Sequence, residues 1–179
     1  MASAAQPPGT HPLKVDLSDL ADAFDEASWE LRIYLDLDTG AVIRVPPHIR
    51  EELGAIHTEL PDEPPGPEAH EPEWMREVRR EADFIEAGLG SRFLQLPEAN
   101  SRASHGDMLA FVATVPQPRL EERLRDALHG RSPFRRFKDV LLEYPEERGR
   151  WFTFKRRCLR DRARAWLAAE RIAPIEEES

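Results

Sequence analysis

The clearest pattern in the chain is an alternation of apolar and polar residues over 29–37, which resumes over 41–45. A period of two is that of a β-strand with one buried face and one polar face. Between the two runs, Asp38-Thr39-Gly40 supplies a glycine that can take the positive φ of a three-residue loop. We therefore predict a β-hairpin, which Pro46-Pro47 ends because neither proline can donate to a ladder.

Elsewhere apolar residues recur at helical spacing. Asp16 can cap a helix over 17–27, and residues 92–96 predict a third short strand before Pro97. Ser104, with Asp107 three residues later, resembles a capping box that opens a helix over 105–115. The other predicted helices lie over 48–60, from Pro72 to Gly88, from Leu120 to Gly130, from Ser132 to Leu141, and over 145–172.

Strands come early, helices come late, and no regular βαβ alternation is present, an order that favours an α+β fold. We predict a small antiparallel sheet, made of the hairpin and the third strand, covered on one face by about five to six helices, with an all-helical C-terminal part. The 179 residues suit one domain. We place it at 13–172, with a Pro-rich loop near 61–72, a mobile tail over 1–12 and an acidic tail over 173–179.

Charge is distributed unevenly along a chain whose formal net charge is −9. Residues 1–118 hold 9 basic and 22 acidic side chains, whereas residues 119–179 hold 16 and 12. Opposite fields favour packing of the two parts against each other, and they leave the basic part able to contact an acidic partner.

No apolar run approaches the ~20 residues that a membrane span needs, and the first residues lack the pattern of a signal peptide. The single Cys158 excludes an intramolecular disulfide and a cysteine zinc cage. We therefore expect a cytoplasmic protein without a membrane partner.

Two basic residues in the last predicted helix, Lys155 and Arg162, point into its apolar arc. Their apolar stems could lie along the core while the charged ends reach the rim. Alternatively they pair with carboxylates such as Glu30 or Asp36 of the hairpin, or they line a pocket for an anionic ligand.

Chemical motifs are sparse, and we assign no catalytic residue, metal ligand or cofactor. Glu30, Asp36 and Asp38 could gather around a cation at the hairpin end, although a turn and a solvent-facing strand edge explain them as well. His105 precedes Asp107 where helix capping already accounts for the pattern. Glycine-rich nucleotide loops and the hydrolase Gly-x-Ser-x-Gly motif are missing from the sequence.

Basic residues interleaved with aromatic ones give the best lead. Residues 131–164 hold 12 basic and 5 acidic side chains, and such interleaving is typical of surfaces that track phosphates and stack bases. Helical spacing nevertheless places Phe134, Phe137, Trp151 and Phe154 inward, which leaves a positive face without a stacking platform. The candidate binding residues are Arg131, Arg135, Arg136, Lys138, Arg156, Arg157, Arg160 and Arg164.

The segment from Phe134 to Leu141, Phe-Arg-Arg-Phe-Lys-Asp-Val-Leu, resembles a signature of the bacterial Uncharacterised Protein Family one-five-eight. The likeness continues in Trp151-Phe152-Thr153-Phe154-Lys155 and Ala165-Trp166-Leu167, and upstream in Arg92-Phe93-Leu94-Gln95-Leu96-Pro97, Pro72-Glu73-Trp74, Asp38-Thr39-Gly40 and Val15-Asp16-Leu17, so it covers roughly 13–172. The resemblance implies a bacterial cytoplasmic protein built as one unit. It implies no activity, ligand or catalytic residue.

Three functions are consistent with the sequence. The first is a non-catalytic binding or adaptor protein that uses its arginine-rich helical face to contact an acidic protein or a nucleic acid. The second is a metal-assisted hydrolase that uses Asp36 and Asp38 with His105. The third is a structural subunit of an oligomer, since unpaired strand edges invite self-association.

Overall fold

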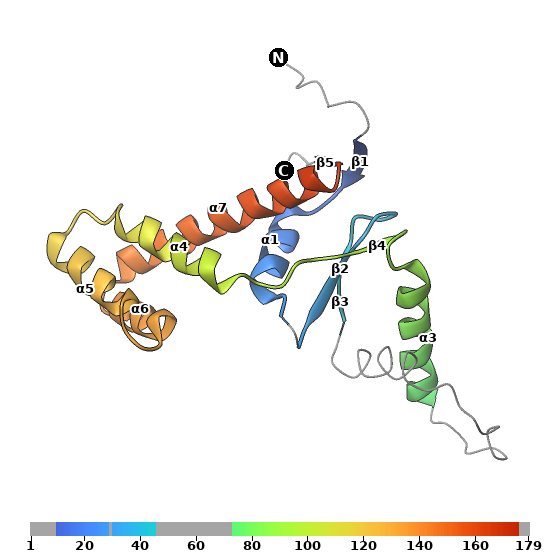
Figure 1. Ribbon diagram of the computed structural model, residues 1–179, viewed down its shortest axis with the longest axis horizontal. Coiled ribbons are helices and arrows are strands. Elements are labelled where there is room, and N and C mark those ends of the chain that lie inside the picture. Colours follow the sequence, from blue (N-terminus) through green and yellow to red (C-terminus); the bar gives the residue numbers. More distant parts are fainter. Residues whose placement is uncertain (1–9, 29, 46–72, 176–179) are drawn as a thin grey trace.

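The computed structural model describes residues 10–28, 30–45 and 73–175, and it has the predicted α+β architecture (Figure 1). The helix predicted over 48–60, the Pro-rich loop and Trp29 lie outside these residues. None of the described helices is both long and apolar enough to cross a membrane. In chain order the elements are β1 (His11–Lys14), α1 (Leu17–Glu26), β2 (Arg32–Asp36), β3 (Val42–Val45), α3 (Glu73–Gly88), β4 (Phe93–Gln95), α4 (Ser101–Val112), α5 (Pro118–Leu128), α6 (Pro133–Leu142), α7 (Pro145–Ala169) and β5 (Ile172–Ile175).

The predicted hairpin and third strand form a three-stranded antiparallel sheet of order β3-β2-β4. Tyr34 of β2 lies opposite Ile43 of β3 on one side and Gln95 of β4 on the other. At the β2–β3 turn, Gly40 has a φ of 75°, and a Cβ at this position would lie 1.8 Å from the carbonyl oxygen of Lys14. Glycine is therefore required both for the turn conformation and for its close approach to β1.

Side chains from helices cover both faces of β2. Ile33 and Leu35 belong to a core cluster that includes residues of α1 and α7, whereas Tyr34 faces Ile85 of α3. Asp36 is also buried, with 4% of its surface exposed. The predicted polar face of this strand is therefore wrong, because α3 packs where the alternation of side chains indicated water (Figure 1).

A second sheet, which the sequence did not predict, joins the two ends of the described chain. β1 and β5 pair in parallel, so the predicted tails over 1–12 and 173–179 overlap ordered strands. The N–H of His11 donates to the carbonyl of Arg171, and the register then turns the nitrogens of Pro12 and Pro174 toward the open edges. Short segments interrupted by proline give little strand signal, and the same prolines discourage further pairing.

Helix α4 begins four residues earlier than the prediction of 105. The side chain of Asn100 accepts hydrogen bonds from the backbone N–H groups of Arg102 and Ala103, so Asn100 is the N-cap. The predicted capping box at Ser104 is therefore wrong, and its Asp107 forms an ion pair with Arg162 of α7.

Helix α7 connects two hydrophobic cores. Toward its N-terminus, Trp151 packs with Phe111 of α4 and Phe137 of α6, and toward its C-terminus, Ala163 and Leu167 pack with α1 and the strands. Figure 1 shows α7 running from the group of α4, α5 and α6 to the pair β1 and β5. The side chains that α7 leaves exposed therefore extend from the group of α4, α5 and α6 to the pair β1 and β5.

Candidate binding surface on helix α7

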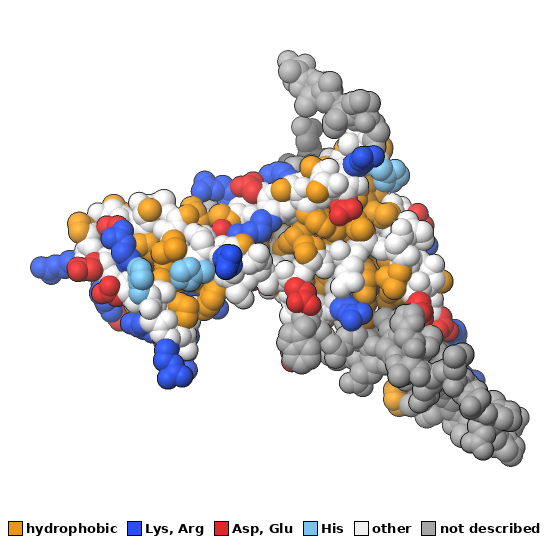
Figure 2. Space-filling model, in the orientation of Figure 1, with side chains coloured by type: hydrophobic (Ala, Val, Ile, Leu, Met, Phe, Trp, Pro, Cys, Tyr) orange, Lys and Arg blue, Asp and Glu red, His pale blue; other side chains and the backbone are white. Residues whose placement is uncertain are grey.

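Four of the candidate arginines lie on one side of α7. Arg156, Arg160 and Arg164 recur every four residues, so they occupy successive turns, and Arg157 lies beside them. All four side chains are exposed. Figure 2 shows basic side chains along the upper edge of α7 in that view, with acidic side chains among them. We call these four residues the α7 arginine face.

The α7 arginine face lines a shallow hollow of about 360 Å³, together with Thr153 and Asp161. Its guanidinium groups are only partly neutralised. Arg164 lies 3.9 Å from the carboxylate of Asp161, and Arg160 donates to the hydroxyl of Ser18 at 2.6 Å. Arg156 has no hydrogen bond or ion pair with any residue that the structure describes. Planar guanidinium groups with free N–H donors suit phosphate and carboxylate oxygens.

A second hollow, of about 600 Å³, adjoins the first along α7. It is lined by two aromatic rings, two arginines and small side chains: Phe111, Thr114, Gly149, Arg150, Thr153, Phe154 and Arg157. The guanidinium of Arg150 lies over the Phe111 ring at 5.7 Å, and that of Arg157 lies over the Phe154 ring at 5.1 Å. We call this the aromatic hollow. The sequence placed Phe154 inward, but its side chain is only partly buried.

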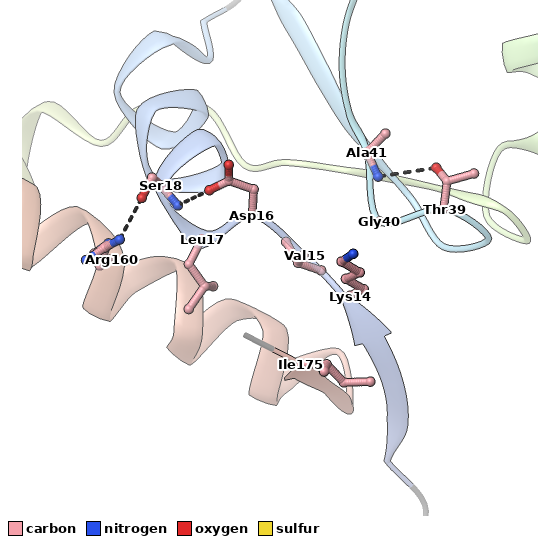
Figure 3. Close-up of a pocket in the computed structure, with 10 residues that line it drawn as sticks. All are labelled: Lys14, Val15, Asp16, Leu17, Ser18, Thr39, Gly40, Ala41, Arg160 and Ile175. Carbon is pink, nitrogen blue, oxygen red and sulfur yellow. Dashed lines mark hydrogen bonds between the residues drawn. The ribbon is translucent and has the colours of Figure 1, made fainter. Parts of the chain in front are cut away.

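Arg160 also reaches a third hollow, of about 540 Å³, at the start of α1 (Figure 3). Lys14 and Ile175 line it from the β1–β5 pair, and Gly40 lines it from the β2–β3 turn. Asp16 cannot take a ligand there with its capping oxygen, because that oxygen accepts the N–H groups of Ser18 and Asp19. Sequence analysis did not indicate this hollow, because its walls come from four separate segments.

The other four candidate residues lie on or next to α6. Arg131, Arg135 and Lys138 are exposed, and Arg135 lies 3.9 Å from Asp139. Arg136 lies so close to Gly130 that a Cβ on this glycine would overlap its guanidinium, and it lines a different hollow with Arg123, Asp126 and Asp139. Because α6 packs at the N-terminal end of α7, the eight candidates form two groups (Figure 1).

Lys155 and Arg162 both form ion pairs, though with partners other than those predicted. Lys155 donates to Asp25 of α1 at 2.6 Å, and Arg162 donates to Asp107 of α4 at 2.5 Å. About a quarter to a third of each basic side chain remains exposed. Of the three alternatives considered from the sequence, ion pairing is confirmed, and the partly exposed charged ends agree with a position at the rim of the core. The pocket for an anionic ligand stays a prediction.

The residues considered for catalysis serve other contacts. Asp36 accepts hydrogen bonds from Arg92, Thr39 and the backbone N–H of Asp38, and it does not contact Lys155. His105 lies on α4 with its Nε2 3.3 Å from the carbonyl of Leu128. Within the described ranges, no three His, Cys, Asp or Glu side chains are placed to hold a metal ion.

Arg92 also lowers the pKa of Asp36 to about 2, mainly through the hydrogen bond between the two side chains. A carboxylate held in its charged form by an arginine is a poor proton donor at neutral pH. Burial raises the pKa of the Cys158 thiol, which does not favour its use as a nucleophile. The protonation of these groups therefore points to structural roles.

The chain matches the model of a protein family described as "Uncharacterised protein family (UPF0158)" over residues 77–179, and it belongs to this family. It is similar to UPF0158 protein PA5073 of the bacterium Pseudomonas aeruginosa, with 29% identity over 168 residues, or 94% of this chain and 90% of the relative. The resemblance inferred from the sequence is confirmed. No solved structure matches the chain.

Proposed function

We propose that this protein is a non-catalytic binding or adaptor protein whose α7 arginine face contacts an anionic partner, either an acidic protein or a nucleic acid. The observation that carries the proposal is the convergence of Arg156, Arg157, Arg160 and Arg164 on one hollow with a single carboxylate, that of Asp161, among its lining residues. Positive charges this close repel one another, and an anionic partner would relieve the repulsion that solvent and counter-ions only screen.

The contrast with the rest of the molecule supports this proposal. Arg44, Arg92 and Arg123 each contact carboxylates at 2.7–2.9 Å. On the α7 arginine face, Arg156 and Arg157 form no ion pair with the described residues. The arginines that hold the fold together are thus paired closely, whereas these two keep donors available for another molecule.

Two triple charge reversals test the proposal. The first is Arg156→Glu, Arg157→Glu and Arg164→Glu on α7, and the second is Arg131→Glu, Arg135→Glu and Lys138→Glu around α6. Both change the net charge by the same amount. Binding of a fluorescent oligonucleotide and of a fluorescent polyglutamate peptide is measured by anisotropy at low salt.

We expect the wild type to bind at least one probe, with an affinity that falls as salt rises. The α7 reversal should abolish this binding, and the α6 reversal should weaken it only through net charge. If the two reversals have equal effects, the α7 arginine face is not the site. If the wild type binds neither probe at low salt, the proposed function is wrong.

A further inference from the structure

The arginine-lined hollow and the aromatic hollow form one continuous site. They share Thr153 and Arg157 as lining residues. From Arg150 to Arg164 the site extends over 14 residues of α7, which is about 21 Å at the helical rise of 1.5 Å per residue. A linear ligand could therefore contact both hollows at once.

The aromatic hollow has features that a purely charged ligand would not use. Phe111 at its base is buried, with 1% of its surface exposed, whereas Phe154 is partly exposed; Arg150 and Arg157 lie over these two rings. Arg150 is held in place by Glu147 at 2.6 Å and by the carbonyl of Thr114 at 3.1 Å. Flat bases stack on aromatic rings and on guanidinium planes.

We propose, resting on the proposed function, that the anionic partner is a single-stranded nucleic acid. One base lies in the aromatic hollow, stacked on the guanidinium plane of Arg157, which itself lies over the Phe154 ring, and the phosphates that follow it lie along the α7 arginine face. At about 3.4 Å per nucleotide of a stacked strand, 21 Å corresponds to about six nucleotides. The geometry favours a short binding site of this kind. A longer site is not favoured, because the net charge of the protein as a whole is negative.

The two competing partners would leave part of this site unused. A peptide of acidic side chains alone would pair with the guanidiniums but has no flat group for the aromatic hollow. A duplex keeps its bases stacked inside the helix, so it could offer phosphates but no free base. The combination of rings and arginines is therefore matched best by a strand with exposed bases.

The test compares three labelled probes of equal length by anisotropy at low salt: a single-stranded oligouridylate, an RNA duplex and a polyglutamate peptide. The main variant of the full chain is Phe154→Leu, which removes the ring but keeps an apolar side chain. Phe152→Leu is its matched control, since Phe152 is an exposed aromatic residue of α7 that lies beside Arg148 and does not line either hollow. Arg157→Lys is a second variant, which keeps the charge but loses the planar group.

We expect Phe154→Leu to weaken oligouridylate binding about tenfold, because the guanidinium plane of Arg157, on which the base stacks, loses the ring beneath it. Arg157→Lys should weaken it several-fold, and Phe152→Leu should leave it unchanged. Because Phe154 also contacts the core, thermal unfolding checks the fold of each variant, and Arg157→Lys decides the matter if Phe154→Leu does not fold.

The outcomes separate this inference from the proposed function. If polyglutamate binds at least as tightly as oligouridylate, or if Phe154→Leu and Arg157→Lys leave oligouridylate binding unchanged, the single-strand inference is overturned and the proposed function stands. Equal affinity for duplex and single strand overturns it in the same way. If the wild type binds none of the three probes, both the inference and the proposed function fail.

Discussion

Two groups of charged side chains, at the β2–β3 turn and on α7, differ in how far neighbouring side chains neutralise their charge. At the turn, the buried carboxylate of Asp36 accepts two hydrogen bonds from Arg92 and one from Thr39, and Arg92 stacks on the rings of Phe84 and Phe93. On α7, four exposed arginines share a hollow with the carboxylate of Asp161. We call the first group, Asp36, Asp38, Thr39 and Arg92, the turn cluster.

A run of charged residues in a sequence therefore does not by itself reveal its role. The sequence suggested Asp36 as a possible cation ligand. In the structure, its hydrogen bonds with Arg92 connect β2 to the segment before β4. Arg156 and Arg157 of the α7 arginine face form no ion pair with the described residues. We therefore expect changes in the turn cluster to alter stability, and changes on the α7 arginine face to alter binding.

The largest effect on stability is expected where the β2–β3 turn meets β1. Gly40→Ala should lower the free energy of unfolding by about 3 kcal/mol, because a positive φ costs about 1–2 kcal/mol and the new Cβ overlaps a backbone oxygen of Lys14. Chemical denaturation measures the change. Gly90→Ala is the control, because Gly90 has a similar φ of 74° but open space around it. This variant should lower the free energy of unfolding only by the cost of the positive φ. Equal losses in the two variants would show that the approach to Lys14 does not matter.

Next in size is the loss of the buried charge. Asp36→Asn should destabilise the fold by about 2 kcal/mol, because Arg92 would lose a charged acceptor inside the protein. Urea denaturation of the variant and of Asp38→Asn makes the comparison. Asp38 contacts the same arginine at 3.3 Å, but 65% of its side chain is exposed, so its replacement should change stability by less than about 0.5 kcal/mol. A larger loss in Asp38→Asn than in Asp36→Asn would contradict this account of the turn cluster.

Acid should reveal the same interaction in the wild type. Arg92 lowers the pKa of Asp36 from 3.8 to about 2 in the folded protein, so the folded state favours the charged form. The resulting stabilisation is complete above about pH 5 and is lost as the pH falls through 4 toward 2, which amounts to about 2 kcal/mol. Denaturation of the wild type and of Asp36→Asn at several pH values measures it. The difference between the two proteins should shrink on acidification, and a constant difference would contradict the prediction.

The sequence predicted local elements well where one periodicity dominated. The hairpin with its positive φ at Gly40, the strand before Pro97 and the helix capped by Asp16 are all confirmed. The predicted three-residue loop is wrong, because Asp36 lies opposite Ala41 and four residues, 37–40, separate them. The fold class followed from their order. What the sequence could not supply was the contacts between distant segments: the pairing of β1 with β5, and the packing of α3 on the second face of β2, depend on partners far away in the chain.

The candidate site shows the same division. Arg156, Arg157, Arg160 and Arg164 were identified from helical spacing alone, and α7 brings them together. Their separation from Arg131, Arg135, Arg136 and Lys138 needed the packing of α6 against one end of α7. The partly exposed position of Phe154 was missed, because a periodicity of apolar residues separates faces of a helix and does not show a ring that lies at the boundary between them.

A smaller effect is expected at the ion pairs on the sides of α7. In a double-mutant cycle with Arg162→Met and Asp107→Leu, the two side chains should show a coupling of about 1 kcal/mol, because both are partly shielded from water. The same cycle on Arg164 and Asp161, which are more exposed and 3.9 Å apart, is the control and should show less. Thermal or chemical denaturation provides the free energies. A coupling near zero for the first pair would mean that its members are held at the rim by packing alone.

The smallest effect on stability is expected on the α7 arginine face itself. Arg156→Gln and Arg157→Gln should each change the free energy of unfolding by less than about 0.5 kcal/mol, since both side chains are exposed and neither forms an ion pair among the described residues. The same substitutions should weaken polyanion binding, because each removes a charge from the site. Denaturation and anisotropy on the same preparations measure the two effects. If these variants lose stability as Asp36→Asn does, the α7 arginines are part of the folded framework, and the contrast between the two groups of charge disappears.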